Sequence, residues 1–509
     1  MENLNEKSAV ELAKLIETKQ VSSREVTQYF IDRIEEVNPK INAVVLKFYD
    51  EALKKADEAD EKLAKGESLG KLHGLPFTIK ECFDYPGTPS TLGVLARKND
   101  KPAETDAYIQ NLMDEGGIVL GKTNVPQLLI FIESVNRVYG RTNNPINDKF
   151  TCGGSSGGEG AIVGAGASPV GIGSDIGGSV RFPAAFCGIC SIKPTMWRTP
   201  DLTRYGAKRL EGPINSVAGV LGRHAEDLDL FLRIINERAA KMFDVQPLQN
   251  YRETDVSKLK IGYFLSDGIF EPNAAVKRGV LQAVEKLKSL GAQIVEFQPL
   301  KPELAEEIFL RILTVNDARV FTEVLEGEEP LPQLKNLFML AQASPFKRNL
   351  LRKIAQVFGQ KSVTRIIPYV GGNTLESLRE WAEKQAAYRA EFLAEMDKEN
   401  LDAIISPVCA LPGFLHDSTD KVGLGGTYTL LYNVLGFPAG VARVSTVEKS
   451  EAVSTRKGFD QQARAAALTE VLTEGLPVSV QIAARPWRED IVLSLIESLH
   501  ESSQSERKN

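Results

Sequence analysis

A glycine-rich run at residues 151–183, TCGGSSGGEGAIVGAGASPVGIGSDIGGSVRFP, constrains the fold of this chain more than any other feature. It contains eleven glycines, which mark places where a backbone turns tightly or approaches another segment closely. It also contains five serines, which are Ser155, Ser156, Ser168, Ser174 and Ser179. Two interpretations follow: tight loops that present a reactive serine, or close glycine packing without chemistry.

The N-terminal residues 1–66 read as helices. Ser8 with Glu11 and Ser22 with Glu25 each match the capping box, in which a serine and a glutamate three residues later satisfy the first backbone amides of a helix. We therefore expect N-terminal helices that pack on the core.

Beyond residue 66, helical and strand patterns alternate. Residues 240–400 are mostly helical in pattern. Strand patterns occupy the segments 75–80, 118–124, 401–408, 436–444 and 476–485. Such alternation predicts an α/β fold in which a large mixed β-sheet core is covered by helices on both faces. We expect one domain over 67–500, with a mostly helical substrate cap at about 240–400, and a flexible tail at 501–509.

The composition excludes several classes of protein. The formal net charge is −6, so the chain has no excess of positive charge with which to bind nucleic acid. The charged N-terminus lacks the apolar core of a signal peptide, and no apolar stretch approaches the roughly 20 residues of a membrane span, so we expect a cytoplasmic protein. The five cysteines predict free thiols. Cys187 and Cys190 form a C-x-x-C without a second ligand pair, so we expect no metal and no cofactor.

Two short motifs match known sites in an unsuitable context. Residues 116–123 fit the G-x-x-x-x-G-K-[ST] phosphate-binding loop, but a helix pattern precedes them and a strand pattern occupies them, the reverse of what phosphate binding needs. Ser155 also lies at the centre of a G-x-S-x-G nucleophile elbow. That elbow requires an acid and then a histidine downstream, which His416 or His500 could supply only by chance.

Ser179 is the candidate nucleophile of the run. Two glycines precede it, so the backbone amides of Ile176, Gly177, Gly178 and Ser179 could converge on one point. Converging amides of this kind stabilise the oxyanion that forms when a serine attacks a carbonyl. The segment therefore has the form of an oxyanion hole.

A lysine is the candidate base, because the chain has only four histidines and none lies near the run. Lys80 ends the apolar segment 75–80, and burial lowers the pKa of a lysine toward a value suited to proton abstraction. A lysine in this position also often buries only its stem and keeps its amine in water. Both interpretations of Lys80 stay open from these residues.

Taken together, these segments resemble the amidase signature family, and within it the fatty-acid amide hydrolase-like branch. The resemblance covers roughly residues 25–500 and rests on GGSSGGEGA, SDIGGSVRFPA and CGICSIKPT, with TNVPQ, YRAEF and LPVSVQIAARPW elsewhere. It implies the amidase signature fold and a Ser-Ser-Lys triad. In that triad Lys80 is the base, Ser155 is a bridging serine on a cis peptide, and Ser179 is the nucleophile. The implied activity is hydrolysis of carboxylic amides, with esters or carbamates as further substrates, through an acyl-enzyme.

Other residues gain a role through the same resemblance. Asp175 and Arg181 flank the nucleophile and are expected to fix its loop by hydrogen bonds. Ser156 is expected to hydrogen-bond the site. Ser168 and Ser174 are expected to serve loop packing alone.

The segment after TNVPQ lines the acyl channel in the fatty-acid amide hydrolase-like branch. In this chain it carries Leu129, Ile130 and Ile132, which suit an apolar acyl or aryl group. Simple core packing explains the same apolar run equally well.

Residues 331–375 contain seven Lys or Arg and no Asp or Glu. Basic, apolar helices can lie on anionic membranes, and the position matches the membrane-facing cap of mammalian fatty-acid amide hydrolase. We expect a small-molecule amide as substrate and weak peripheral membrane contact as one role of this segment. A lid over the substrate path and an ordinary basic surface are the alternatives, and a homodimer is a further candidate assembly.

Two other functions are weighed. The A subunit of the tRNA-dependent amidotransferase, which releases ammonia from glutamine for a partner, usually has threonine before GGS and glutamine after the arginine. Here these positions are Ile176 and Phe182, which favours a stand-alone hydrolase. A non-catalytic scaffold is the other alternative, and the joint presence of Lys80, Ser155 and Ser179 argues against it.

Overall fold

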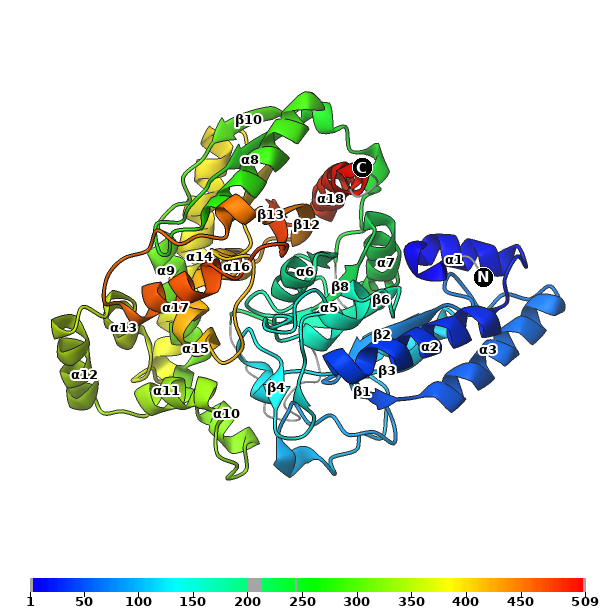
Figure 1. Ribbon diagram of the computed structural model, residues 1–509, viewed down its shortest axis with the longest axis horizontal. Helices are drawn as coiled ribbons and strands as arrows, with labels where there is room; N and C mark the ends of the chain where they lie inside the picture. The colour runs from blue at the N-terminus through cyan, green and yellow to red at the C-terminus, as the bar shows by residue number, and fades with distance from the viewer. Residues whose placement is uncertain (1–2, 200–212, 243–244, 507–509) are drawn as a thin grey trace.

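A sheet of 11 strands runs through the centre of the molecule, as the computed structural model shows (Figure 1). The structure describes residues 3–199, 213–242 and 245–506. The strand order in this sheet is β1-β3-β2-β6-β8-β7-β12-β13-β11-β9-β10, and β4 pairs with β5 in a separate sheet of two strands. The strands are β1 (Val44–Lys47), β2 (Pro76–Lys80), β3 (Ile118–Thr123), β4 (Val135–Asn136), β5 (Gly140–Arg141), β6 (Val170–Asp175), β7 (Cys190–Lys193), β8 (Val217–Gly222), β9 (Lys260–Tyr263), β10 (Gln293–Glu296), β11 (Ala403–Pro407), β12 (Ala439–Thr446) and β13 (Pro477–Ala484).

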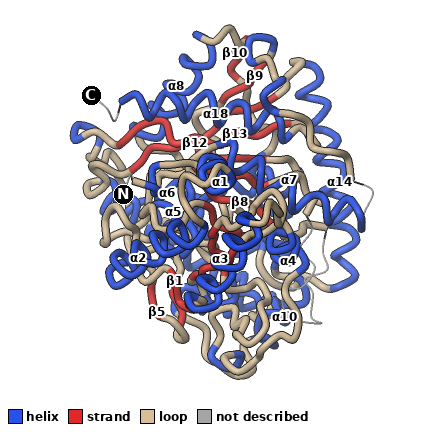
Figure 2. The backbone as a smooth tube through the Cα atoms, turned by 90° about the vertical axis from the view of Figure 1, so that its right-hand side faces the viewer, coloured by secondary structure: helices blue, strands red, loops and turns tan. Residues whose placement is uncertain are grey.

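Strand directions make this sheet mixed. Strand β2 is parallel to its neighbours β3 and β6, and β9 is parallel to β10 and β11. Between these groups, β8, β7, β12 and β13 are antiparallel to one another in turn. Figure 2 shows strands from β1 near the bottom of the view to β10 at the top, with helices on either side. The predicted α/β fold with a large mixed sheet is confirmed.

Helices cover both faces of the sheet. The α-helices are α1 (Ala9–Glu17), α2 (Ser23–Ile41), α3 (Tyr49–Ala64), α4 (Ala107–Asp114), α5 (Gly157–Gly164), α6 (Arg181–Cys187), α7 (Ala225–Met242), α8 (Ala274–Ser289), α9 (Pro302–Leu313), α10 (Arg319–Val324), α11 (Pro332–Ala341), α12 (Pro345–Val357), α13 (Lys361–Ile366), α14 (Leu375–Lys398), α15 (Thr419–Val422), α16 (Thr427–Leu435), α17 (Gln461–Glu470) and α18 (Glu489–Glu506). The side chains of β2 show how the faces differ, because successive side chains of a strand point to opposite sides. Phe77 contacts Phe231 of α7, whereas the next residue, Thr78, contacts Glu159 of α5.

The N-terminal region is helical for the most part, and both predicted capping boxes form, at the starts of α1 and α2. It differs from the prediction in one element. Residues 44–47 form β1, which extends the central sheet by pairing antiparallel with β3. The β-branched pair Val44 and Val45 favours a strand, and the edge of β3 provides the partner.

The region at 240–400 is mostly helical and also contains two strands of the central sheet. Strands β9 and β10 lie within it and complete the far edge of the central sheet, with α8 as the crossover between them. The helices α9 to α14 account for the rest. At the C-terminus, α18 continues to Glu506 and so includes residues 501–506, and 507–509 lie outside the described residues.

Several predicted exclusions can be compared with the structure. Residues 118–123 form the buried strand β3, which is incompatible with a phosphate-binding loop at 116–123. The five cysteines are all buried thiols, and burial raises the pKa of Cys190 and of Cys409 to about 12. Within the described ranges, no group of His, Cys, Asp and Glu side chains could hold a metal ion, and no helix combines the length and apolar character needed to cross a membrane.

Candidate active site

The candidate base lies at the end of a buried strand. Lys80 is the last residue of β2, and Asp175 is the last residue of β6, the parallel neighbour of β2. The carboxyl ends of parallel strands meet at one edge of a sheet, which is where α/β proteins place their sites. Lys80 is 0% exposed, so its amine does not reach water in the way that a surface lysine would.

Two serines surround the Lys80 amine. Lys80 Nζ lies 2.7 Å from Ser155 Oγ and 3.0 Å from Ser174 Oγ, with Ser174 O at 3.4 Å. Ser155 is one of the predicted catalytic residues. Ser174 was expected to serve packing alone, and the structure corrects that expectation, because its hydroxyl is a direct partner of Lys80.

The loop that carries Ser155 is held by close backbone packing. The peptide bond between Gly154 and Ser155 is cis. A Cβ atom on Gly154 would lie 2.6 Å from Phe131 O and 3.0 Å from Glu133 N, so only glycine fits at this position. Ser155 is 2% exposed, and α5 begins two residues later at Gly157. The predicted substrate segment therefore packs directly against the residue before Ser155.

Ser179 lies on the neighbouring loop, between β6 and α6. Its carbonyl oxygen accepts a hydrogen bond of 3.0 Å from the amide of Ser156, which connects the two serine loops. Ser156 Oγ also lies 3.3 Å from both the amide and the carbonyl oxygen of Ser174. Ser179 is partly exposed, in contrast to Lys80 and Ser155. Ser156 thus bridges both loops at the site.

Asp175 and Arg181 fix the loop around Ser179. Asp175 Oδ1 accepts from the amide of Gly178 at 2.8 Å, and Oδ2 accepts from the amide of Val180 at 3.2 Å. Arg181 donates to both oxygens, at 3.0 Å from Nε and 2.9 Å from Nη2. Of the four amides predicted to bind the oxyanion, that of Gly178 therefore donates to Asp175 in this structure.

The Asp175–Arg181 pair is completely buried and fully hydrogen-bonded. Arg181 also donates to Gln481 Oε1 at 2.6 Å and to Thr429 O at 3.0 Å, while Asn433 donates to Asp175 at 3.0 Å. Burial raises the pKa of Asp175, but the Arg181 charge and these hydrogen bonds outweigh it and hold the pKa well below its ordinary value. Asp175 therefore stays an acceptor for the loop amides across the physiological pH range.

The predicted substrate segment has an unusual backbone. Leu128, Leu129 and Phe131 have positive φ angles of 61°, 57° and 83°, a conformation that is uncommon for bulky residues and often marks functional sites. Leu129, Ile130 and Ile132 are half-buried and pack against the main core. Among these three, the side chain of Ile132 lies near Gly426 at the start of α16, as does that of Phe182: a Cβ on Gly426 would lie 3.0 Å from Ile132 Cδ1 and 2.7 Å from Phe182 Cζ.

Apolar side chains that the sequence reasoning missed also border the Ser179 loop. A Cβ on Gly177 would lie 3.0 Å from Phe309 Cζ of α9 and 3.2 Å from Leu430 Cδ2 of α16. Phe182 contacts the same region, 2.5 Å from a Cβ on Gly178. Phe309 and Leu430 come from distant parts of the chain, so no local pattern could have indicated them.

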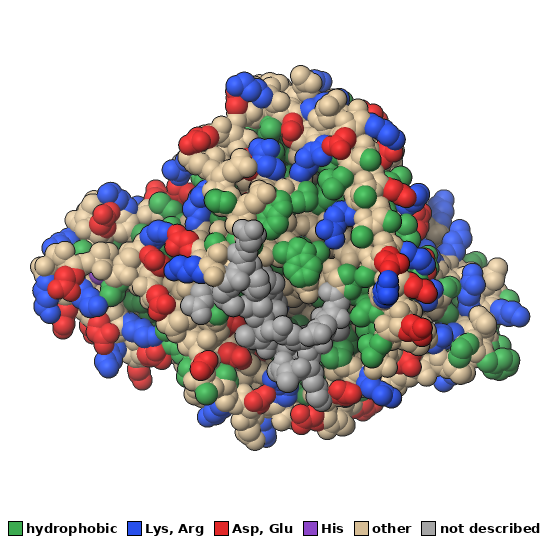
Figure 3. All heavy atoms as spheres, turned by 180° about the vertical axis from the view of Figure 1, so that it is seen from behind, with side chains coloured by type: hydrophobic (Ala, Val, Ile, Leu, Met, Phe, Trp, Pro, Cys, Tyr) green, Lys and Arg blue, Asp and Glu red, His purple; other side chains and the backbone are tan. Residues whose placement is uncertain are grey.

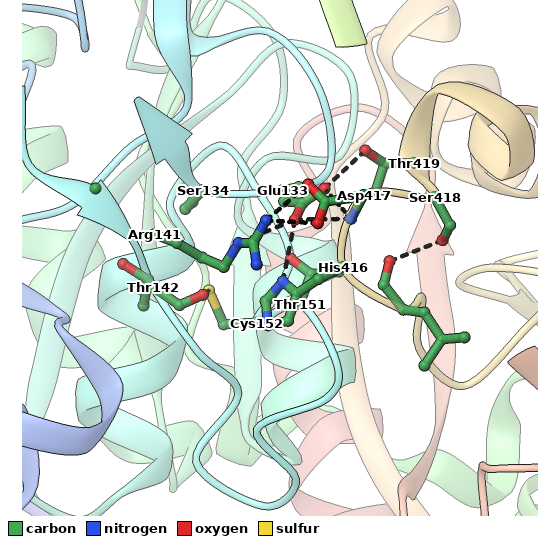
Figure 4. Close-up of polar contacts among 12 residues, drawn as sticks. Glu133, Ser134, Arg141, Thr142, Thr151, Cys152, His416, Asp417, Ser418 and Thr419 are labelled. Atoms are coloured by element: carbon green, nitrogen blue, oxygen red, sulfur yellow. Dashed lines mark hydrogen bonds and ion pairs between the residues drawn. The ribbon is translucent and has the colours of Figure 1, made fainter. Parts of the chain in front are cut away.

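Glu133 secures the other end of the substrate segment (Figure 4). This buried carboxylate accepts from the Asp417 amide at 3.2 Å and from Thr419 Oγ1 at 3.1 Å, and His416 Nδ1 lies 3.0 Å away. Arg141 Nε approaches the same carboxylate at 3.7 Å. His416 is therefore a partner of Glu133, which argues against its use as the histidine of a nucleophile elbow at Ser155. The side chain of His500, the other histidine considered, lies outside the described residues.

A central mixed sheet with a buried lysine beside two glycine-rich serine loops defines a class of hydrolase, and the comparisons with known proteins identify it. The family model Amidase matches residues 25–493, so the chain belongs to the amidase family and hydrolyses amides. It is 32% identical to fatty acid amide hydrolase 1 of Caenorhabditis elegans, over 89% of this chain and 81% of the relative. It is 31% identical to fatty-acid amide hydrolase 1 of Sus scrofa, over 95% of this chain and 83% of the relative.

A solved structure supports the same assignment. The structure of a fatty acid amide hydrolase superposes with a TM-score of 0.84 at 27% identity, and the match covers 98% of this chain and 85% of that one. The amidase fold predicted from the sequence is therefore confirmed.

Proposed function

We propose that this amidase uses a Ser-Ser-Lys triad, in which Lys80 is the base, Ser155 relays protons and Ser179 is the nucleophile. The observation that carries the proposal is the 2.7 Å contact between the buried Lys80 amine and Ser155 Oγ. A lysine without access to water favours its neutral form, which is the form that can accept a proton. The hydrogen bond from the Ser156 amide to Ser179 O supports the same arrangement by holding the two serine loops together.

The chemistry follows from these roles. Neutral Lys80 accepts a proton from Ser155 while Ser155 accepts one from Ser179, and the Ser179 oxygen attacks the amide carbonyl carbon. The candidate amides of Ile176, Gly177 and Ser179 stabilise the resulting oxyanion. The proton returns through Ser155 to the leaving nitrogen, because an amine leaves poorly unless it is protonated. Water then hydrolyses the acyl-enzyme and restores Ser179.

The proposed substrates are amides with an apolar acyl or aryl group. The side chains of Phe182, Phe309 and Leu430 border the Ser179 loop, and Ile132 lies near Phe182; these apolar side chains support this preference. The two relatives are named as fatty acid amide hydrolases, which supports fatty acid amides as the proposed substrates. Phe182 also weakens the glutamine-hydrolysing alternative, because its ring occupies a position where that branch carries a polar glutamine. Esters and carbamates would follow the same acyl-enzyme route.

The Ser179→Ala variant tests the nucleophile. It should abolish both turnover and covalent labelling by a fluorophosphonate probe, because no other hydroxyl is proposed to attack. Thr429→Ser, a conservative change beside the same loop, serves as the labelling control and should keep reacting. Labelling that survives in Ser179→Ala would assign the nucleophile elsewhere.

A series of p-nitroanilides from acetyl to long acyl tests the substrate class, and a preference for acetyl would contradict the apolar proposal.

A surface feature supports peripheral membrane contact as a second proposed property. We call it the α12 tip, and it consists of Phe346, Leu350, Ile354, Val357 and Phe358. Phe346 and Val357 are 80% and 83% exposed, and the basic residues Lys347, Arg352 and Lys353 lie beside them on the same helix. Exposed apolar and basic side chains on one helix suit an anionic membrane surface. A homodimer that covers the same side chains is the alternative, and the cytoplasmic location stays a prediction.

A further inference from the structure

Glu159 is a completely buried carboxyl group close to the candidate base, and the proposed chemistry gives it no role. It is the third residue of α5, which follows the Ser155 loop, and it is 0% exposed. Its Oε2 lies 2.6 Å from Thr78 Oγ1 of β2, and its Oε1 lies 2.8 Å from Thr123 Oγ1 of β3. A Cβ on Gly171 of β6 would lie 2.1 Å from Oε2, so the glycine leaves the space that the carboxyl group fills.

These contacts place Glu159 beneath the part of the sheet that carries Lys80. Thr78 lies two residues before Lys80 on the same strand, so both side chains point to the same face. Thr123 is the residue of β3 that pairs with Lys80 in the parallel register. The charge of Lys80 acts on Glu159, and the two hydroxyl groups provide its hydrogen bonds. The protonation state of Glu159 therefore bears directly on Lys80.

The surrounding hydrogen bonds favour a protonated Glu159. Thr78 Oγ1 also lies 3.2 Å from Ser168 Oγ, and Ser168 donates its own proton to Val170 O at 2.8 Å. Ser168 Oγ can thus accept a hydrogen bond from Thr78, whose hydroxyl group has only one proton to donate. If Thr78 donates to Ser168, the 2.6 Å contact with Glu159 needs its proton from the carboxyl group. With an ionised Glu159, no proton would remain between Thr78 and Ser168.

We propose that Glu159 is a positioning residue that holds a proton at neutral pH, and that this neutral carboxyl group leaves Lys80 able to act as an uncharged base. The proposal rests on the proposed function of Lys80. Burial is the main reason for the state of Glu159, because an ionised carboxylate loses its hydration in such a site. It raises the pKa of Glu159 to about 8, although the two threonines and Lys80 act in the opposite direction.

The consequence for Lys80 has a definite sign. A negative charge beside a lysine stabilises its protonated form and raises its pKa. A protonated Glu159 has no such charge, so Lys80 loses its proton at a lower pH than it would beside a carboxylate. Ser168 also gains a role here, as part of the hydrogen-bond chain that receives the Thr78 proton, in place of loop packing alone.

Infrared difference spectroscopy tests the protonation state directly. The spectrum of the native protein minus that of Glu159→Gln at pH 7 should contain a carboxylic-acid carbonyl band, which disappears as the pH rises above about 8. Asp175→Asn is the matched control, since Asp175 is equally buried but ion-paired with Arg181, and its difference spectrum should contain no such band. A carboxylate band from Glu159 at pH 7 would overturn the proposal. Spectra of the native protein at pH 7 and pH 9 provide the same test if a variant does not fold.

The kinetics of two variants test the positioning role. Glu159→Ala should lower kcat/KM by about tenfold or more, whereas Glu159→Gln, which is neutral and has similar shape, should recover most of that loss. The midpoint of the acidic limb of the kcat/KM profile should stay in place for Glu159→Gln. A shift of that midpoint to lower pH by about one unit would show that native Glu159 is ionised and would overturn the proposal. Equal losses for Ala and Gln would also overturn it. If Ser179→Ala keeps its label, the proposed function fails while the infrared result stands separately.

Discussion

The side-chain amine of Lys80 is buried away from water, and serine hydroxyl groups are its hydrogen-bonding neighbours instead. Ser155 Oγ and Ser174 Oγ lie 2.7 and 3.0 Å from Nζ. A buried lysine is costly to charge, which suits a base that must start neutral. Ser174 orients the amine toward Ser155 from the neighbouring strand, so its hydroxyl should matter to the reaction.

The Ser174→Ala variant checks that inference. Removal of one hydrogen bond to the base should lower kcat by about tenfold, which corresponds to about 1.4 kcal/mol of transition-state stabilisation. Ser191→Ala is the matched control, because Ser191 is also buried on a sheet strand and its hydroxyl has no hydrogen-bond partner among the described residues. Its kcat should stay near that of the native protein. Similar kcat values for the two variants would show that Ser174 only packs.

The loop between β6 and α6 is the element that presents Ser179, and its shape depends on two features. Asp175 and Arg181 hold its backbone from one side, through the amides of Gly178 and Val180. On the other side Gly178, with a φ of 118°, brings the chain close to Phe182 and Thr429. A residue with a side chain would strain this backbone and collide with both neighbours.

The Gly178→Ala variant should therefore damage the site. Its Cβ would lie 2.5 Å from both Phe182 Cε2 and Thr429 Oγ1, which forces the loop to move. Displacement of a nucleophile by about 1 Å can cost about 100-fold in rate, and we expect a loss of kcat/KM of that order. Gly268→Ala is the control, since Gly268 has a φ of 78° with nothing within 4 Å of the added Cβ. Both variants place alanine at a positive φ, but only Gly178→Ala also creates a collision. Kinetic and thermal-unfolding measurements on the two variants therefore separate the effect of the collision from that of backbone strain.

Helices and strands were predictable where residues close together in the sequence specify them. Both N-terminal capping boxes and the strands at 75–80 and 118–124 were located from residue patterns, and each forms. β1 was missed because only four residues form it, and its stability comes from pairing with β3 far along the chain. For the same reason, the pattern of 240–400 did not indicate that β9 and β10 belong to the central sheet.

The whole chain combines a catalytic sheet with a protruding helical end. In Figure 1, α12 and α13 lie far from the N-terminal helices α1 to α3. Figure 3, which views the molecule from behind, shows hydrophobic and basic side chains at the tip of that end, on the right. The exposed side chains of the α12 tip are the basis for expecting contact with lipid.

Sedimentation with liposomes measures that contact. A variant with Phe346→Ser, Val357→Ser and Phe358→Ser should bind anionic vesicles less than the native protein, and added salt should weaken native binding, because each basic residue contributes about 1 kcal/mol at an anionic surface. Leu290→Ser is the control, since Leu290 is 41% exposed and follows α8, away from the α12 tip. Analytical ultracentrifugation without lipid tests the homodimer. A native dimer that the triple variant dissociates, with vesicle binding unaffected, would assign the surface to self-association instead.

The motifs of the linear chain were enough to indicate the amidase family, the fold and the identity of Lys80, Ser155 and Ser179 as candidates, because those signals lie in runs of neighbouring residues. Only the folded chain decided which groups meet. Lys80 and Ser174 are 94 residues apart, Glu159 contacts Thr78 from another element, and the Gly178 amide donates to Asp175. The strands β2 and β6 are buried at every position, so no alternation of polar and apolar residues revealed their register or the direction of each side chain.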